Sequence, residues 1–301
     1  MPYITQTALE LGFLYALVAM ALFLSYRILD IADLTTDGCF VLGSAVSVTM
    51  AASGHPVLAI PAAMLAGMAA GFVTAFLQTK LGVPSILAGI VTNMGLYTIN
   101  LMVMGWSANV SLLKTETIFT MFENAGIGGS WHEALLAGLI TILMGVLLLL
   151  FLGTRLGLSV RATGDNLDMV RASSINPAFT ITVGLCLSNA MTALSGAMVG
   201  QYQNAADING GTGIVVIGLA CLIIGETVLG RRTLVKGAIA AVIGSVIYRL
   251  IYAIILYTKI MPVQGLRLIT AIVVALAIAF PTIKNWLLFQ KRKAAARKGG
   301  N

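Results

Sequence analysis

Long apolar runs separated by short polar connections form the dominant pattern along this chain. Nine runs are predicted to form helices, at residues 8–27, 38–53, 57–78, 84–104, 133–153, 178–201, 213–229, 237–257 and 266–284. Because about 20 residues of α-helix cross the roughly 30 Å hydrocarbon core of a bilayer, most of these runs are long enough to span it. The second and seventh runs are short, which predicts tilted, broken or re-entrant helices.

The composition agrees with a membrane location. The chain has 301 residues, of which 58% are apolar and 10% are charged, and its mean hydropathy is +0.96. We therefore predict an all-α polytopic membrane helix bundle, with about eight or nine transmembrane segments and a broken second helix, as a single domain over residues 1–301. Two small-xxx-small patterns, Gly67–Gly71 and Gly196–Gly200, predict close contacts between its helices.

The basic residues that give the net charge of +7 are grouped beside the predicted spans. The groups lie at 155–171, 231–236 and 284–298. Because cytoplasmic loops carry an excess of Lys and Arg, this placement predicts a cytoplasmic C-terminus and an N-terminus outside. The basic tail at about 285–301 is either a contact for anionic lipid head groups or a flank that stops transfer. Nucleic acid is not an expected partner.

No feature of the sequence predicts enzymatic chemistry. There is no Gly-x-x-x-x-Gly-Lys-Ser/Thr phosphate loop, so ATP binding by the common route is not expected in this chain. The two histidines, His55 and His132, fall near predicted helix ends far apart in the sequence, which does not favour a metal centre. We expect no catalytic residue, no metal site and no cofactor in the chain itself.

The most polar stretch of the chain lies between the fifth and sixth apolar runs. It carries four charged residues within eleven positions, namely Arg161, Asp165, Asp168 and Arg171. A polar segment of this length between two spans is interpreted as a docking helix for a separate motor protein, within a cytoplasmic segment at about 155–177. The alternative is an amphipathic loop that lies on the membrane surface.

The ends of the docking helix are predicted from local signals. Asp165 is suited to cap a helix that starts at Asn166. Asp168 falls in the first turn and Arg171 toward the other end, where each charge suits the helix dipole. Pro177 ends this helix and begins the next span.

The docking helix also carries a small apolar ridge. Leu167, Val170 and Ser174 share one face at helical spacing, and Met169 lies beside them. A ridge of about two turns is too short to fold alone. It is therefore predicted to fit a groove on the partner.

Three motifs, taken in order, resemble one family of proteins. They are Asp33-Leu-Thr-Thr-Asp-Gly-Cys-Phe-Val-Leu-Gly43, then Arg161-Ala-Thr-Gly-Asp-Asn166 with Ala172 and Ile175-Asn176, then Ser195-Gly-Ala-Met-Val-Gly-Gln-Tyr202 with Gly210, Gly211, Gly213 and Gly225. They are similar to the permeases of bacterial ABC importers for branched-chain amino acids, ribose and nucleosides. The chain departs from that pattern at Ser174, where the family often has glycine, and at Glu226, where a second glycine is common.

The resemblance implies a set of partners and a location. A second permease copy would complete a homodimer in the bacterial plasma membrane. Two cytoplasmic ABC ATPases would bind ATP and Mg, and an extracellular or periplasmic solute-binding protein would deliver the solute. The residues assigned to ATPase docking are Arg161, Gly164, Asp165, Leu167, Asp168, Val170, Arg171 and Asn176.

Polar residues within the spans are candidates for a solute path, because polar groups in hydrocarbon need partners or a cavity. Asn93, Tyr97 and Asn100 share one face of the fourth run. Amides donate and accept hydrogen bonds without a fixed charge, which suits a path, although hydrogen bonding between helices is an equal alternative. Ser188 and Asn189 form a second candidate pair.

The segment 30–37 allows two interpretations. Its charges and turn-forming residues make either a simple cytoplasmic loop or a helix broken within the bundle, whose exposed backbone groups line a passage. The resemblance favours the broken helix. Asp37 and Gly38 would then lie nearest the path.

These observations favour a transmembrane permease subunit of an ATP-binding-cassette importer. It would move a small solute, an amino acid and in particular an aromatic one, by alternating access driven by the separate ATPase. A nucleoside or sugar permease is the alternative within the class. An ion-coupled secondary transporter is the alternative outside it, but neither an inverted repeat nor a coupling carboxylate within the membrane is evident in the sequence.

Overall fold

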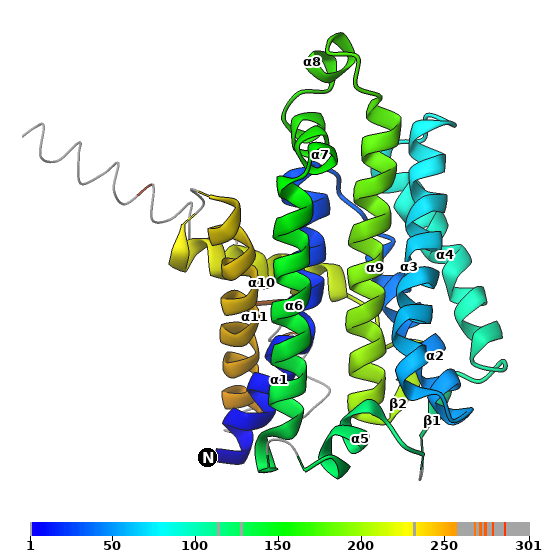
Figure 1. Ribbon diagram of the computed structural model, residues 1–301, viewed down its shortest axis with the longest axis vertical. Helices are drawn as coiled ribbons and strands as arrows, with labels where there is room; N and C mark the ends of the chain where they lie inside the picture. Colours follow the sequence, from blue (N-terminus) through cyan, green and yellow to red (C-terminus); the bar gives the residue numbers. More distant parts are fainter. Residues whose placement is uncertain are drawn as a thin grey trace, which may run out of the picture.

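The computed structural model describes residues 2–112, 115–126, 129–230 and 233–257, with seven single positions from 268 to 286. The long helices are α1 (Pro2–Leu22), α3 (Pro56–Thr79), α4 (Ser85–Val103), α6 (His132–Gly153), α9 (Pro177–Gln203) and α11 (Leu234–Tyr257). Shorter apolar helices are α2 (Thr36–Ala52) and α10 (Ile214–Leu229), and a π-helix, η1 (Phe23–Ile28), continues α1. Figure 1 shows the long helices packed side by side as an upright bundle.

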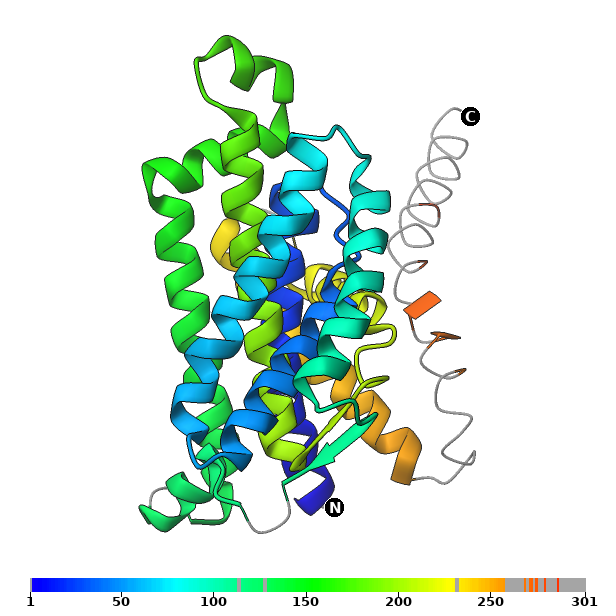
Figure 2. The ribbon, with the colours of Figure 1, turned by 90° about the vertical axis from the view of Figure 1, so that its right-hand side faces the viewer.

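The length and composition of these helices confirm an all-α polytopic membrane bundle. Six of the described helices are long and apolar enough to cross a membrane. Helices α2 and α10 are shorter, with 17 and 16 residues, as the second and seventh runs predict. In Figures 1 and 2, α10 lies across the bundle rather than along it. The ninth predicted run and the basic tail at 285–301 fall almost wholly outside the described residues.

The core of the bundle surrounds α1. Its residues Leu14, Leu17 and Met20 are fully buried, and this cluster of buried residues extends to α6, α9, α10 and α11. A helix that is apolar all round is buried on all sides. The first predicted span is therefore a central element of the bundle rather than a peripheral one.

Helix α9 approaches α2 and α3 so closely that the contact positions admit only glycine. A Cβ atom on Gly196 would collide with the backbone oxygen of Phe40 in α2, and one on Gly71 would lie 2.6 Å from the oxygen of Leu185. Such contacts bring helix backbones together without side chains between them. The predicted role of the two small-xxx-small patterns in helix packing is confirmed at these positions.

The chain is unwound inside the bundle over residues 29–35, between η1 and α2, whereas α2 itself is continuous from Thr36 to Ala52. The favoured interpretation of segment 30–37 is therefore right about a break within the bundle but places it inside the second helix, and we use broken helix below for the interruption between η1 and α2. The π-helix ends at Ile28, the chain then runs without helix to Leu34, and α2 begins at Thr36. Asp33 is 2% exposed and Thr35 is completely buried. A simple surface loop would leave both in water.

An ion pair connects the end of the first helix to α10. The Nε atom of Arg27 in η1 lies 3.0 Å from the Oε1 atom of Glu226. The Glu226 side chain is 5% exposed and that of Arg27 is 38% exposed. Glu226 is thus held by a basic partner.

Small elements cover the end of the bundle that carries the N-terminus. They are β1 (Asn109–Ser111), α5 (Ile118–Asn124), the 3₁₀ turn η2 (Gly129–Trp131) and β2 (Ala205–Asp207). The two strands pair antiparallel, with Val110 opposite Ala206. They tie the connection after α4 to the connection after α9.

The opposite end carries the charged segment, folded as two helices. Figures 1 and 2 show α7 (Arg155–Asp165) and α8 (Leu167–Ala172) at the far end from the N-terminus. The predicted cap at Asp165 is wrong: Asp165 ends α7, and the Oδ1 atom of Asn166 accepts from the amide of Met169 at 3.0 Å. Asparagine is an equally good cap and stands one residue closer to the first turn.

The predicted apolar ridge is also wrong in part. Val170 is fully buried against the chain itself, whereas Leu167 and Met169 are 44% and 52% exposed. Ser174 lies beyond α8 with φ of 60°. Helical spacing places Leu167 and Val170 on similar faces, but it does not reveal that α8 turns Val170 inward.

The glycine contacts of α9 allow a matched test. Gly196→Ala inserts a methyl group against the backbone of α2, and overpacking of this kind costs roughly 1–3 kcal/mol. Gly95→Ala, in α4, meets no atom within 4 Å and should be neutral or stabilising by up to about 1 kcal/mol through helix propensity. Thermal unfolding in detergent should show a lowered midpoint for Gly196→Ala alone. Equal midpoints for the two variants would contradict the close contact.

Candidate solute cavity and docking end

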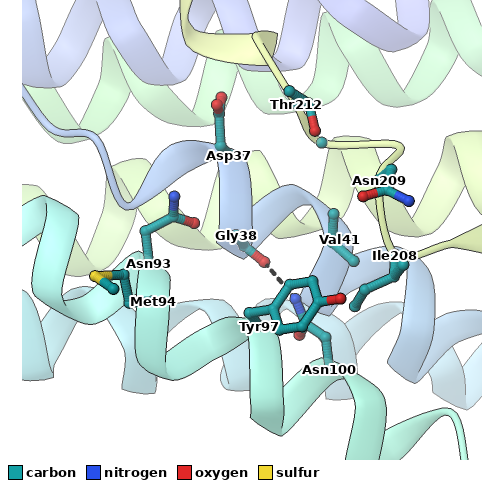
Figure 3. A pocket seen from close by; sticks show the side chains of 11 residues that line it. Asp37, Gly38, Val41, Asn93, Met94, Tyr97, Asn100, Ile208, Asn209 and Thr212 are labelled. Carbon is teal, nitrogen blue, oxygen red and sulfur yellow. Dashed lines mark hydrogen bonds between the residues drawn. The ribbon is translucent and has the colours of Figure 1, made fainter. Parts of the chain in front are cut away.

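A cavity of about 390 Å³ opens beside the break in the second helix. Its walls come from the start of α2, from α4 and from the connection between α9 and α10 (Figure 3). Five residues predicted for the path line it together: Asp37, Gly38, Asn93, Tyr97 and Asn100. They come from two helices separated by more than 50 positions in sequence, so their convergence is a property of the fold.

Asp37 joins the broken helix to α10. Its Oδ2 and Oδ1 atoms accept hydrogen bonds from the backbone amides of Gly213 and Val215, at 3.0 and 2.9 Å. These amides begin α10, where free N–H groups and the helix dipole favour a negative charge. Gly213 has φ of 82°, a conformation that glycine adopts without strain. Asp37 therefore both lines the cavity and fixes the start of α10.

Asn100 is the deepest polar residue of the cavity. It is 1% exposed, and its Nδ2 atom donates to the backbone oxygen of Gly38 at 3.1 Å (Figure 3). Its Oδ1 atom is buried and has no hydrogen-bond partner among the described residues. A buried acceptor without a donor is costly, and this one belongs to a residue of the cavity wall.

The remaining lining residues of α4 include both a polar amide and apolar surface. Asn93 packs its Oδ1 atom against the α-carbon side of Gly38, where a Cβ atom would collide with it. Tyr97 is 51% exposed and Met94 is 71% exposed, and both offer apolar surface. The described lining contains one carboxylate and no basic side chain.

Sequence reasoning missed the third wall of the cavity. Ile208, Asn209, Gly211 and Thr212 line it from the α9–α10 connection. A Cβ atom on Gly211 would collide with the backbone oxygen of Asp37. The run of glycines from 210 to 213 is the available signal for a close backbone approach, but it does not say which helix is approached.

Ser188 and Asn189 lie outside this cavity. The Oγ atom of Ser188 donates to the backbone oxygen of Ala21 at 2.9 Å, within the core around α1. The Nδ2 atom of Asn189 donates to the Oδ2 atom of Asp33 at 2.7 Å and to the oxygen of Leu185. The structure thus places this pair in contacts between helices, and not beside Asn93, Tyr97 and Asn100.

A second cavity, of about 610 Å³, lies at the docking end. Five of the eight residues predicted for docking line it, namely Gly164, Asp165, Leu167, Arg171 and Asn176. The first residues of the break, Leu29, Asp30 and Ile31, also line it. Of the remaining three, Val170 is buried, Arg161 lies within α7, and Asp168 forms an exposed pair with Arg171 at 3.7 Å.

A helical bundle that crosses the membrane repeatedly and holds a polar cavity at a broken helix defines a membrane permease. The chain belongs to the family described as branched-chain amino acid transport system, permease component, whose model matches residues 4–283. It is a multi-pass membrane transport protein of the ABC permease class.

Several curated relatives agree with this family. The chain is 33% identical over 281 residues to a tyrosine transport system permease protein of Clostridioides difficile, covering 93% of this chain and 91% of that protein. An uncharacterized protein of Rickettsia prowazekii is 32% identical, covering 91% and 96%. The autoinducer 2 import system permease protein LsrC of Yersinia enterocolitica is 29% identical over 59% of this chain and 48% of its own length. No solved structure matches.

The place of Asn100 in the cavity wall, where it holds Gly38, predicts a loss of solute binding on substitution. Asn100→Leu keeps the side-chain volume but removes both amide groups from the cavity, and the loss of one hydrogen bond to a buried partner costs about 1–3 kcal/mol. Uptake at limiting solute should fall by about tenfold or more. The control is Met102→Leu, because Met102 is 58% exposed on the same helix and does not line the cavity. Equal uptake by both variants would mean that Asn100 only joins helices.

Proposed function

We propose that this chain is the transmembrane permease subunit of an ATP-binding-cassette importer that moves an amino acid, an aromatic one such as tyrosine being the favoured substrate. A separate cytoplasmic ATPase drives alternating access, and a second copy of the chain completes the permease. A solute-binding protein delivers the solute to the end of the bundle that carries the N-terminus. The docking end, with α7 and α8, faces the cytoplasm.

The cavity beside the broken helix is the observation that carries this proposal. Its volume of about 390 Å³ falls in the lower part of the roughly 300–1,000 Å³ range of small-molecule pockets. Apolar surface from Tyr97 and Met94 suits an aromatic side chain. Asn100 and Asn209 offer neutral polar groups for its backbone substituents. The likeness to a tyrosine transport permease supports the same class of solute.

ATP-dependent uptake is the experiment that tests the class and the solute together. Proteoliposomes that contain the full chain, its ATPase and its solute-binding protein should accumulate labelled tyrosine only when ATP is supplied. Unlabelled phenylalanine should compete, and ribose and adenosine should not. Competition by a nucleoside or sugar alone would replace the proposed solute. Uptake driven by an ion gradient without ATP would replace the class.

Exposed apolar side chains on α8 and the attachment of α7 to the bundle support a protein contact at the docking end. Leu167 and Met169 are exposed on α8, while Val170 anchors that helix to the chain. The hydroxyls of Thr163 in α7 and Thr180 in α9 are hydrogen-bonded at 2.7 Å, which fixes α7 to the bundle. We therefore assign the ATPase contact to Leu167 and Met169 in place of the predicted Leu167 and Val170.

Charges at those two positions should release the ATPase. Burying an apolar side chain of this size is worth roughly 1.5–3 kcal/mol, and about 1.4 kcal/mol is tenfold in affinity. Leu167→Asp with Met169→Asp should therefore abolish co-purification of the ATPase, while the permease still folds. Met121→Asp is the matched control, because Met121 is 41% exposed on α5 at the other end. Undiminished co-purification of the double variant would show that α8 is only a surface loop.

A further inference from the structure

A carboxylic side chain lies buried in the broken helix without a basic partner. Asp33 is 2% exposed. Its Oδ1 atom accepts from the amide of Thr35 at 2.9 Å and its Oδ2 atom accepts from Asn189 at 2.7 Å. Asn189 belongs to the middle turns of α9, so Asp33 sits deep in the bundle and far from either end.

The described groups around Asp33 on α2, α3 and α9 carry no charge. Helix α3 contributes Thr74, whose hydroxyl is hydrogen-bonded to that of Thr35 at 2.8 Å. Helix α9 contributes Asn189, and α2 contributes Cys39, the nearby titratable thiol. Among the described residues, no Lys, Arg or His forms an ion pair with Asp33.

Charged groups in the adjoining parts of the chain have other surroundings. Arg27 is paired with Glu226, Asp30 is exposed, and Asp37 is held by the amides at the start of α10. None of them compensates a charge on Asp33. An ionised carboxylate buried among neutral groups is strongly disfavoured, and such a group normally becomes neutral instead.

An unsatisfied acceptor on the amide group that contacts Asp33 also favours a protonated carboxyl. Asn189 is completely buried, and its Oδ1 atom has no hydrogen-bond partner among the described residues. This oxygen belongs to the amide group that donates to Asp33. A protonated Asp33 supplies an O–H donor beside that amide, whereas an ionised Asp33 supplies only acceptors.

We propose that Asp33 and Asn189 form a proton-binding site within the broken helix, and that the bound proton stabilises the packing of this segment against α9. Loss of the proton breaks the O–H bond of the Asp33 carboxyl, and the proton passes to water. The remaining carboxylate would be a buried charge with no cation, so this packing becomes less stable as pH rises.

Infrared spectroscopy of the purified full chain tests the protonation state directly. At neutral pH the wild type should show the carbonyl stretch of a protonated carboxylic acid, because surface carboxylates are ionised there. Asp33→Asn should lack this band. Asp30→Asn should keep it, because Asp30 is an exposed carboxyl in the same loop whose φ of 55° asparagine tolerates. A wild-type spectrum without the band would overturn the proposal.

The pH dependence of unfolding gives an independent measurement. A folded state that holds a proton which the unfolded chain releases loses stability as pH rises. As pH rises above the ordinary range of a free carboxyl group, about 4, the unfolding equilibrium constant of the wild type should rise, by up to about tenfold per pH unit, relative to that of Asp33→Asn. Asp30→Asn should follow the wild type.

The outcomes of this comparison are distinct. Parallel curves for the wild type and Asp33→Asn would contradict the proton site. If Asp33→Asn does not fold, because its amide nitrogen cannot accept the hydrogen bond that Asn189 donates, the presence or absence of the infrared band in the wild type decides the question. Neither measurement uses the ATPase or a solute, so both remain decisive if the proposed transport function fails.

Discussion

The close approach of α9 to α2 and α3 is the constraint on which the rest of this structure depends. Glycine at positions 43, 67, 71 and 196 leaves no space for side chains between these backbones. Without a hydrophobic driving force in lipid, helix association depends on such packing and on hydrogen bonds between helices. The same approach brings Asn189 against the broken segment, so that Asp33 finds a hydrogen-bond partner deep in the bundle.

Three carboxyl groups in or beside the broken region are accommodated in three different ways. Glu226 is paired with the guanidinium of Arg27. Asp37 takes the free amides at the start of α10, which stabilise a negative charge without a cation. Asp33 has only neutral partners, and the proposed proton would remove its charge. The differences follow from what each side chain contacts, since all three lie in a setting where an unsatisfied charge is costly.

The two cavities are lined by different ends of the broken segment. Leu29 and Asp30 line the cavity at the docking end, and Asp37 and Gly38 line the candidate solute cavity. A Cβ atom on Gly164 in α7 would collide with the backbone oxygen of Ile28, so α7 packs directly on the start of this segment. Under the proposed function, a push on α7 and α8 would reach the solute cavity through residues 28–38. The short path offers a physical route for coupling in the proposed transport cycle.

The long apolar helices of this protein can be read from patterns along the chain, whereas the contacts among them follow only from the fold. Hydrophobic run length and period predicted the apolar helices, the short second and seventh runs, and the shared face of Asn93, Tyr97 and Asn100, because these depend on residues close together in the chain. The cap was predicted at Asp165 and lies at Asn166, because the two neighbours have similar capping strength and local propensity does not separate them. The inward turn of Val170, the wall formed by residues 208–212, and the pairing of Asp33 with Asn189 lay beyond prediction. Each depends on which helix faces approach one another, and periodicity along one helix carries no information about the face opposite.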